Sequence, residues 1–412
     1  MNYAVILAAG KGSRMLSSKA KCSIPIFERP MISYVYDAIP SNFDRVLCVV
    51  GHLKEDIINS LGLDIAYYTQ THQIGTADAV KCVLNDIKCE GHTLILSGDI
   101  PLITREVLNG LYNKHLDNDN DITILSTETK TPLGYGRVIR KFGRVIRIEE
   151  DGETLEFNNN EIYGGVMILK NEILPLIESI ENKNKKNEYF LTDLIKIASS
   201  EYKVGSYSAL DSNVLVGINT PKQLVEATKI MKNRILEYHI KNGTYIEDPD
   251  TTIIYPNVEI RRGSVIKPNT IIKSNTIIGQ NTTIGPYAYI RQNCVIGDNS
   301  QIGSFVEIKQ SQIGQNTKIN HHAYIGDAQI GDNVIFGCGA ITVNFNGTEK
   351  NITKIGDNTL VGCNANLIAP VTIGKNCYIA AGSIVNKEVL DETFYKNNKE
   401  VVLYKNKVSL NE

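Results

Sequence analysis

Residues 266–296 read IKPNTIIKSNTIIGQNTTIGPYAYIRQNCVI, and an isoleucine occupies every sixth position of this stretch. The same spacing begins at Ile254 and continues to Val385, with two one-residue shifts and one longer interruption. A period of six fits neither the 3.6-residue repeat of an α-helix nor the alternation of a plain strand. It is typical of a triangular parallel β-helix, in which each face of a coil takes one hexapeptide.

The repeat predicts which residues of each hexapeptide fill the interior of the β-helix. The isoleucines should stack inward in ladders, and small residues four positions later, such as Ala323 and Ala365, should also point inward. Glycine and asparagine suit the tight corners. The length allows about seven coils of 18 residues. Residues 344–354, NFNGTEKNITK, break the period and are expected to form an inserted loop, which on a rigid scaffold is where function is often carried.

The first 220 residues show a different pattern, in which apolar segments alternate with helix-like segments. This pattern predicts an α/β domain with a mostly parallel sheet. The expected strands are 3–10, 45–51, 92–99, 121–127 and 161–170, and the expected helices are 31–39, 55–62, 75–86 and 188–200. A helical arm should follow, beginning at Pro221 and ended by Gly243. We therefore expect three parts, at 1–220, 221–243 and 244–412.

The composition excludes several classes of protein. The 412 residues carry a formal net charge of −2, which gives no bulk attraction to nucleic acid or anionic membranes. No apolar run approaches the roughly 20 residues of a membrane-spanning helix, and the N-terminal segment predicts a buried strand rather than a signal peptide. The eight cysteines are scattered without a Cys-x-x-Cys motif, which favours reduced thiols in a cytoplasmic protein.

Two stretches of the first half suggest phosphate chemistry. The first strand runs into LAAGKGSRM (7–15), where Gly10 and Gly12 would let backbone N–H groups approach phosphate oxygens and Arg14 would add charge. Lys21 follows as a second cation, although the ending of a Walker A loop is missing. Asp99 comes directly after a buried strand, where a carboxylate could hold Mg²⁺. Taken singly, these could also be an ordinary glycine turn and an ordinary turn aspartate.

The second half contains adjacent histidines, His321 and His322. In the hexapeptide frame Ile319 and Ile325 point inward and Ala323 fills the small inward position, so both histidines lie outside the core. Histidine suits proton transfer near neutral pH. Periodicity alone does not choose between the two rings.

The motifs LAAGKGSRM, QTHQIGTADA, LSGDIPL, GYGRVIR and VGIN, followed by the hexapeptide repeat, resemble one family across nearly the whole chain. It is the bifunctional bacterial N-acetylglucosamine-1-phosphate uridyltransferase / glucosamine-1-phosphate N-acetyltransferase family. The resemblance implies a Rossmann-like nucleotidyltransferase domain, a helical arm and a left-handed parallel β-helix. It also implies Mg²⁺ as cofactor, UTP and acetyl-CoA as substrates, and a homotrimer.

The resemblance implies specific roles in the first half. Arg14 and Lys21 would be the catalytic cations on the UTP triphosphate, and Asp99 and Asn219 would ligate Mg²⁺. Positions implied to contact UTP or the sugar are Leu7, Ala8, Ala9, Gly10, Gln70, Gly75, Thr76, Gly136, Glu150 and Tyr163. Tyr163 replaces the asparagine that the family uses at the sugar, which leaves the sugar selectivity open.

In the second half the resemblance selects His321 as the general base. Arg291, Lys309, Tyr324 and Asn344 would bind the acetyl acceptor, and Lys350, Cys363 and Ala381 would contact acetyl-CoA. The chain departs from the family at Ile335, Phe345 and Cys363, and its tail lacks an arginine for which Lys396 and Lys399 could substitute. A weakened acetyltransferase or a shifted acceptor therefore stays open. A further alternative is a nucleotidyltransferase whose β-helix is structural or regulatory.

Overall fold

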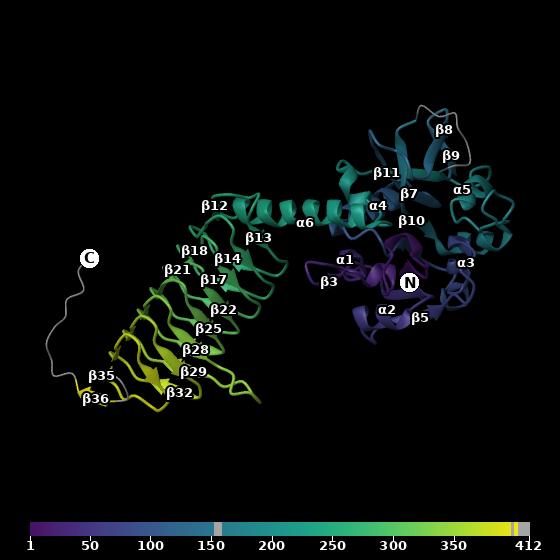
Figure 1. Cartoon of the computed structure of the whole chain (residues 1–412). Helices are drawn as coiled ribbons and strands as arrows, with labels where there is room; N and C mark the ends of the chain where they lie inside the picture. Colours follow the sequence, from purple (N-terminus) through teal and green to yellow (C-terminus); the bar gives the residue numbers. More distant parts are fainter. Residues whose placement is uncertain (152–158, 397–398, 403–412) are drawn as a thin grey trace. The chain divides into compact units, whose positions relative to one another are not determined.

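The five predicted strands of the first half join two further strands, β5 and β11, in one sheet (Figure 1). The order of the strands is β11-β7-β10-β6-β1-β4-β5. β10 runs antiparallel to both of its neighbours, while the other neighbouring pairs of this order are parallel. The expected α/β fold with a mostly parallel sheet is confirmed. The strands are β1 (Tyr3–Ala8), β4 (Arg45–Val50), β5 (Ala66–Thr69), β6 (His92–Ser97), β7 (Ile122–Glu128), β10 (Glu161–Lys170) and β11 (Val204–Ser208).

Helices cover both faces of this sheet, so the side chains of β1 are buried on both sides. Ile6 packs in a core with α1 (Met31–Ala38), α2 (Lys54–Leu61) and α4 (Arg105–Asp117). Val5 packs on the opposite face with α3 (Thr76–Lys81) and α5 (Asp193–Ala198). Successive side chains of a strand point to opposite faces, so a strand covered on both sides is apolar at every position.

Shorter elements complete the N-terminal part. A hairpin of β8 (Arg137–Lys141) and β9 (Arg144–Glu149) attaches to β10 through β8. The remaining elements are β2 (Pro25–Ile26), β3 (Arg29–Pro30) and the 3₁₀ segments Ser13–Met15, Lys21–Ser23, Leu84–Asp86, Asn171–Ser179 and Ser212–Leu215.

The computed structural model describes residues 1–151, 159–396 and, as backbone, 399–402. The chain divides into two units, Met1–Ile230 and Met231–Glu412. The boundary falls within α6 (Pro221–Lys241), whose residue Leu236 belongs to the core of the second unit. Most of the C-terminal tail, and with it the side chain of Lys399, lies outside the described residues. No helix in the described parts is both long and apolar enough to cross a bilayer.

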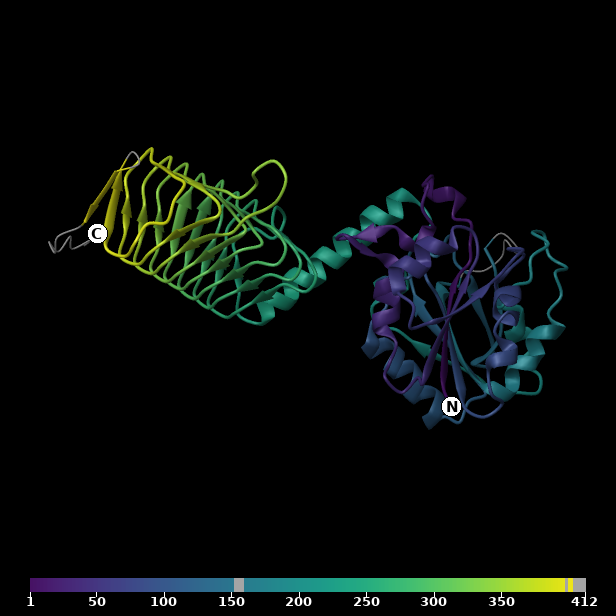
Figure 2. The same ribbon diagram turned by 90° about the horizontal axis from the view of Figure 1, so that it is seen from below.

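The second unit is a left-handed parallel β-helix with three sheets, as the hexapeptide period predicts (Figure 2). The first sheet contains β12 (Tyr245–Ile246), β15 (Val265–Ile266), β18 (Thr283–Ile284), β21 (Gln301–Ser304), β24 (Lys318–His321), β27 (Ile335–Phe336), β30 (Leu360–Val361), β33 (Tyr378–Ile379), β35 (Thr393–Lys396) and β36 (Lys399–Val402). The second contains β13 (Ile253–Ile254), β16 (Ile271–Ile272), β19 (Tyr289–Ile290), β22 (Glu307–Lys309), β25 (Tyr324–Gly326), β28 (Ile341–Val343), β31 (Asn366–Ile368) and β34 (Ile384–Val385). The third contains β14 (Glu259–Ile260), β17 (Ile277–Ile278), β20 (Val295–Ile296), β23 (Gln312–Ile313), β26 (Ala328–Ile330), β29 (Thr353–Ile355) and β32 (Val371–Ile373).

The corners of the coils explain the recurring asparagines. The third residue after the inward isoleucine commonly adopts positive φ, which asparagine and glycine tolerate better than other residues. His322 occupies this position after Ile319, with φ of 48°. Asparagines in the same conformation are Asn257, Asn269, Asn275, Asn281, Asn293, Asn299, Asn316, Asn333, Asn358, Asn364 and Asn376.

Two features differ in extent from the expectation. The stack of strands begins at Ile246, one strand earlier than Ile254, where the repeat was expected to begin. The eight-residue spacing between these two isoleucines does not fit the six-residue period, so the sequence did not indicate this first strand. The inserted loop comprises residues 344–352, since β28 ends at Val343 and β29 begins at Thr353. Figure 1 shows this yellow-green segment projecting from the coils.

Candidate functional site

A cavity of about 200 Å³ opens beside the carboxyl end of β6. Loops from distant parts of the first unit line it, as expected for an open α/β sheet. It brings together seven of the residues assigned to the uridyltransferase site by resemblance, which are Leu7, Thr76, Asp99, Gly136, Glu150, Tyr163 and Asn219. Ser97, Tyr135, Leu191 and Thr192 also line it and were not assigned a role from the sequence.

Lys21 lies at the centre of a polar cluster beside this cavity. Its Nζ donates to Asp99 Oδ2 at 2.5 Å and to Asn219 Oδ1 at 3.1 Å. Nη2 of Arg14 donates to the same Asn219 oxygen at 3.0 Å. Burial alone would lower the pKa of Lys21, but the Asp99 carboxylate outweighs it and raises this pKa above its ordinary value. The charged form of Lys21 is therefore favoured, and Arg14 contacts the same Asn219 oxygen.

The glycine loop is shaped to bring Lys21 there. Gly12 has φ of 62°, and a Cβ at this position would lie 2.6 Å from the Cβ of Lys21. A side chain at residue 12 would push Lys21 away from Asp99. At Gly10, by contrast, a Cβ would meet nothing within 4 Å, so the space above this backbone is open to a ligand.

The oxygen atoms that converge on Lys21 fit a divalent cation. Asp99 offers a carboxylate and Asn219 an amide oxygen, and hard cations such as Mg²⁺ take oxygen ligands while keeping several waters. The described residues hold no group of three or more His, Cys, Asp or Glu side chains that would make a closed metal cage. A metal here would therefore be shared with water and substrate oxygens.

Gln70, Gly75 and Thr76 form the side of the site that resemblance assigns to the uracil. Gln70 is buried and its Nε2 donates to the carbonyl of Gly75 at 3.0 Å. Gly75 has φ of 136°, and a Cβ on it would overlap the backbone of Tyr189. The hydroxyl of Thr76 accepts from the backbone N–H of Leu191 at 2.9 Å. The segment is thus fixed from two directions before any ligand binds.

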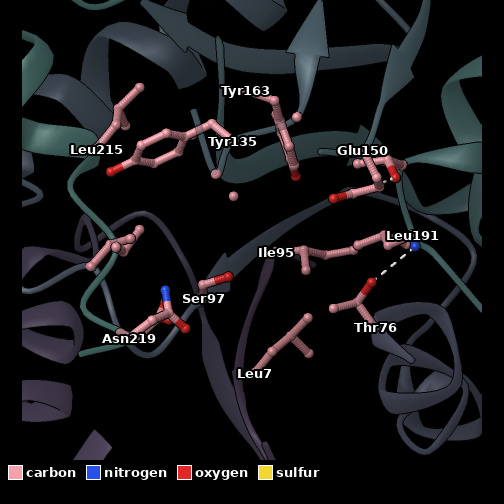
Figure 3. Close-up of a pocket in the computed structure, with 18 residues that line it drawn as sticks. Leu7, Thr76, Ile95, Ser97, Tyr135, Glu150, Tyr163, Leu191, Leu215 and Asn219 are labelled. Carbon is pink, nitrogen blue, oxygen red and sulfur yellow. Dashed lines mark hydrogen bonds between the residues drawn. The ribbon is translucent and has the colours of Figure 1, made fainter. Parts of the chain in front are cut away.

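Tyr163 and Glu150 point toward the interior of the cavity in Figure 3. Thr192 donates to Glu150 Oε1 at 2.8 Å and orients the carboxylate. Burial and then the charge of Glu150 raise the pKa of Tyr163 well above its ordinary range, so its hydroxyl remains a hydrogen-bond donor at neutral pH. The backbone N–H of Tyr163 donates to the carbonyl of Gly136 at 2.8 Å, which ties the two predicted sugar contacts together.

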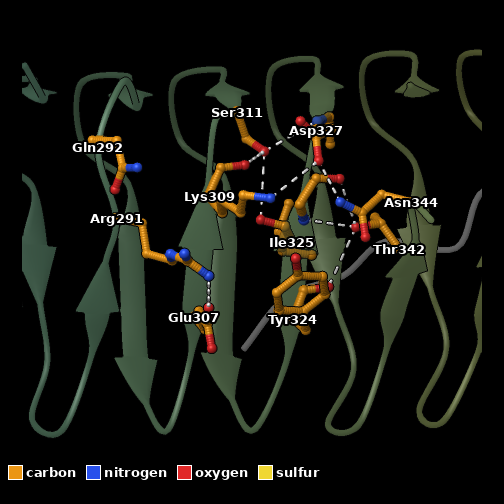
Figure 4. A network of polar contacts seen from close by, with 12 residues as sticks. Arg291, Gln292, Glu307, Lys309, Ser311, Tyr324, Ile325, Asp327, Thr342 and Asn344 are labelled. Atoms are coloured by element: carbon orange, nitrogen blue, oxygen red, sulfur yellow. Dashed lines mark hydrogen bonds and ion pairs between the residues drawn. The ribbon is translucent and has the colours of Figure 1, made fainter. Parts of the chain in front are cut away.

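In the β-helix, several predicted acceptor-binding residues gather on the second sheet (Figure 4). Nη1 of Arg291 pairs with Oε1 of Glu307 at 3.1 Å. On the next strands Nζ of Lys309 lies 3.8 Å from Oδ2 of Asp327, which also accepts a hydrogen bond from Asn344. Asn344 also bonds to Tyr324, whose pKa burial raises. The two acidic partners, Glu307 and Asp327, were not anticipated from the sequence.

The charge of this surface is suited to an anion. Lys350, from the inserted loop, lies close enough to lower the pKa of Lys309, and burial acts in the same direction. Lys350 was assigned to acetyl-CoA by resemblance, but in the structure it lies beside Lys309, one of the predicted acceptor-binding residues. In the part of the chain that the structure describes, Nε of Arg291 is buried without a hydrogen-bond partner. The Arg291 side chain as a whole is partly exposed, so its guanidinium can bind a phosphate oxygen.

His321 lies elsewhere. It ends β24 on the first sheet, opposite Ser304 of β21, and lines a separate cavity of about 390 Å³ with Lys267, Gln301 and Asn320. The corner at His322 separates it from Tyr324 and the cation surface. The predicted acetyl-CoA positions Cys363 and Ala381 follow strands of the same sheet as His321. Within one chain the structure therefore groups His321, the predicted base, with Cys363 and Ala381 and not with Arg291 and Lys309.

Comparison with known proteins agrees with this two-part organisation. A family model described as a MobA-like NTP transferase domain matches residues 4–190, and one described as bacterial transferase hexapeptide (six repeats) matches 275–310 and 352–387.

Full-length relatives match both halves at once. The chain is 40% identical to the bifunctional protein GlmU of Acetivibrio thermocellus, over 94% of this chain and 92% of that protein. It is 37% identical to the bifunctional protein GlmU of Acholeplasma laidlawii, over 95% of this chain and 94% of that protein. The GlmU protein of Thermoanaerobacter pseudethanolicus is 40% identical, over 93% of each chain. At this identity and coverage the chain belongs to the family of bifunctional GlmU proteins.

Proposed function

We propose that this chain makes UDP-N-acetylglucosamine in two steps. It transfers an acetyl group from acetyl-CoA to glucosamine 1-phosphate, and then a uridylyl group from UTP to N-acetylglucosamine 1-phosphate. Family membership supports both activities. The observation that carries the assignment of residues is the convergence of Lys21 and Arg14 on Asn219, beside Asp99, at the edge of the nucleotidyltransferase cavity.

Uridylyl transfer needs positioning and charge rather than a protein nucleophile. An oxygen of the sugar phosphate attacks the α-phosphorus of UTP, and pyrophosphate leaves. Arg14 and Lys21 stabilise the negative charge on the transferring and leaving phosphates. We assign Asp99 and Asn219 as the ligands of Mg²⁺, which when bound supplies charge neutralisation on phosphate oxygens. Glu150 and Tyr163 orient the sugar from the other side of the cavity.

Acetyl transfer needs a base. The amine of glucosamine 1-phosphate is mostly protonated at neutral pH and must lose a proton as it attacks the thioester carbonyl. We assign His321 to accept this proton, and Arg291 with Lys309 to hold the phosphate of the acceptor.

Quaternary structure bears on this second site. His321 and the cations lie on different sheets of one chain, so we infer that an acetyl transfer site that uses both is shared between copies. A closed homotrimer of β-helices would allow a corner of one copy to meet a face of another. We therefore propose a homotrimer, and a cytoplasmic location in keeping with eight unpaired cysteines.

Two assays with the purified protein test the proposed function. Glucosamine 1-phosphate and acetyl-CoA, without UTP, should release free thiol, and N-acetylglucosamine 1-phosphate with UTP and Mg²⁺ should release pyrophosphate. Pyrophosphate without thiol would instead select a nucleotidyltransferase whose β-helix is structural or regulatory. Absence of both would overturn the proposal.

The histidine pair offers a matched test within the second activity. His321→Ala should lower acetyl transfer by about 10² to 10⁴-fold, as loss of a general base does, and leave uridylyl transfer unchanged. The control is His322→Asn, because asparagine occupies the same positive-φ corner in other coils. If only His322→Asn abolishes acetyl transfer, the assigned base is wrong by one residue.

A further inference from the structure

Two exposed cysteines occupy equivalent corners of successive coils. In the pairing of β27 with β30, Phe336 lies opposite Val361. If the same register continues two residues beyond each strand, Cys338 lies beside Cys363. β24 pairs with β27 in the same way and places His321 beside Cys338. A histidine and two thiols thus form one column, which we call the corner column.

The backbones of the two cysteines lie against each other. The N–H of Asn364, which follows Cys363, donates to the carbonyl of Cys338 at 2.8 Å. A Cβ built on Gly337 would lie 2.5 Å from the backbone nitrogen of Cys363. Both cysteines precede a positive-φ residue, Gly339 in one coil and Asn364 in the next. Because the two corners have equivalent backbone conformations, the side chains of Cys338 and Cys363 leave the coils in the same direction.

These thiols differ from the other cysteines of the β-helix. Cys294 and Cys377 are buried in the interior of the coils, whereas Cys338 and Cys363 are exposed. Neighbouring strands of a sheet lie about 4.8 Å apart, which falls within the Cα separation of about 4.4 to 6.8 Å that a disulfide spans. Both thiols are therefore accessible in the single chain, and the spacing of their strands is compatible with a disulfide between them.

We propose that Cys338 and Cys363 form a thiol modification site that closes into a disulfide by exchange with a small-molecule disulfide. One thiolate attacks a sulfur of the small disulfide and releases one small thiol. The second thiolate attacks the resulting mixed disulfide and releases the other small thiol. Two protein thiols are oxidised to one disulfide, the small disulfide is reduced to two thiols, and the two protons pass to the departing thiolates.

The position of the pair predicts a consequence for acetyl transfer, and this part rests on the proposed function. Cys338 follows His321 in the corner column, and Cys363 is one of the positions assigned to acetyl-CoA. A disulfide between them would draw both side chains across the path of the thioester toward His321. Oxidation should therefore suppress acetyl transfer and leave uridylyl transfer, in the other unit, untouched.

The covalent step is tested first, on the full chain. The protein is incubated with oxidised glutathione, its remaining thiols are alkylated, and peptides are mapped by mass spectrometry without reduction. An intramolecular Cys338–Cys363 link is expected, which is lost in Cys338→Ser and in Cys363→Ser but kept in Cys89→Ser, a change at an exposed cysteine of the other unit. Stable glutathione adducts on both thiols, or links to other cysteines or to a second copy, would overturn the proposal.

The activity of oxidised and reduced samples is then compared within each variant. Wild-type protein should lose about tenfold or more of its acetyl transfer rate on oxidation, equivalent to about 1.4 kcal/mol in the barrier, and regain it with dithiothreitol. Cys338→Ser should show an oxidised-to-reduced ratio near one. A mapped link without any change in acetyl transfer would overturn the predicted consequence. Reduced protein that transfers no acetyl group would contradict the proposed function, while the mapped link would still stand.

Discussion

Lys21 shows how the role of one side chain depends on its neighbours. In the sequence it is only a second cation near the glycine loop, whereas in the structure it is largely buried against Asp99 and Asn219. A buried ammonium without a partner would tend to lose its proton. The carboxylate of Asp99 reverses that tendency, so the charge persists where a triphosphate is expected to bind.

Replacing Lys21 by methionine should therefore impair the first reaction selectively. Lys21→Met keeps much of the side-chain volume but leaves Asp99 without its partner and removes one stabilising charge. We expect kcat for pyrophosphate release to fall by about 10² to 10³-fold, the usual cost of losing one such group. Lys19→Met, a change at an exposed lysine two residues away, is the control. A Lys21→Met rate close to that of the control would contradict the assigned role.

The coils of the β-helix are elements whose local geometry the sequence specifies directly. Each inward isoleucine contributes to one continuous core, and the asparagine three residues later makes the corner. Positive φ costs most L-residues roughly 1 to 2 kcal/mol, while asparagine and glycine are less affected. The repeated asparagines are thus explained by backbone energetics, without a role in catalysis.

Asn299 provides a test of this explanation, since its φ is 57° at an ordinary corner. Asn299→Ala should lower the free energy of unfolding by about 1 kcal/mol, and Asn299→Gly should change it by less. Urea denaturation followed by far-ultraviolet circular dichroism measures the difference. Equal loss in both variants would show that the amide side chain, rather than the backbone conformation, stabilises the corner.

The packing of α4 on the sheet contains a buried histidine, His115, in contact with the partly buried His92. Nε2 of His115 lies 3.0 Å from Nδ1 of His92, and Nδ1 of His115 lies 2.9 Å from the hydroxyl of Thr123. Burial, with the neighbouring His92 and Lys170, lowers the pKa of His115 from 6.5 to about 4. This imidazole is therefore neutral in the folded protein throughout the mildly acidic range.

This pair should make the first unit sensitive to acid. Between pH 6.5 and about 4 the unfolded chain binds a proton at His115 that the folded chain does not. Stability is unaffected by this group above pH 6.5 and should fall by about 1.4 kcal/mol per pH unit as the pH decreases through that window. Denaturation at pH 7 and pH 5 should show a smaller difference for His115→Gln than for wild type. His52→Gln, a change at an exposed histidine, should keep the wild-type difference.

At the scale of the whole molecule, the two units have separate hydrophobic cores and separate candidate sites. The described residues that line the N-terminal cavity all belong to the first unit, and those of the cation surface all belong to the second. Each activity should accordingly respond to changes in its own unit.

Paired variants test this independence. Arg14→Ala should reduce uridylyl transfer by about 10²-fold and preserve acetyl transfer, and Lys309→Met should do the reverse. Both variants should keep the oligomeric mass of wild type in light scattering, expected to be that of a trimer. A monomeric wild-type protein with full acetyl transfer would contradict a site shared between copies.

The sequence by itself determined the class of each unit and the family, because these depend on local patterns. Inward isoleucines, corner asparagines and the glycine loop each follow from residues close together in the chain. The expected strands and the four expected helices of the first half appear where the alternation of apolar segments put them, and the bounds of α3 and α5 are shorter than expected. The strands β5 and β11, the helix α4 and the hairpin of β8 and β9 were not anticipated, and neither strand of the hairpin has a long apolar run.

Only the tertiary structure decided which of these residues meet. It joined Lys21 to Asn219, placed Lys350 beside Lys309, and separated His321 from the cation surface. Cys338 and Cys363 are the clearest example. They are separated in sequence by more than one ordinary coil because the loop at 344–352 intervenes, yet they stand side by side. Hydrogen bonding between coils sets that register, and the length of an inserted loop does not disturb it.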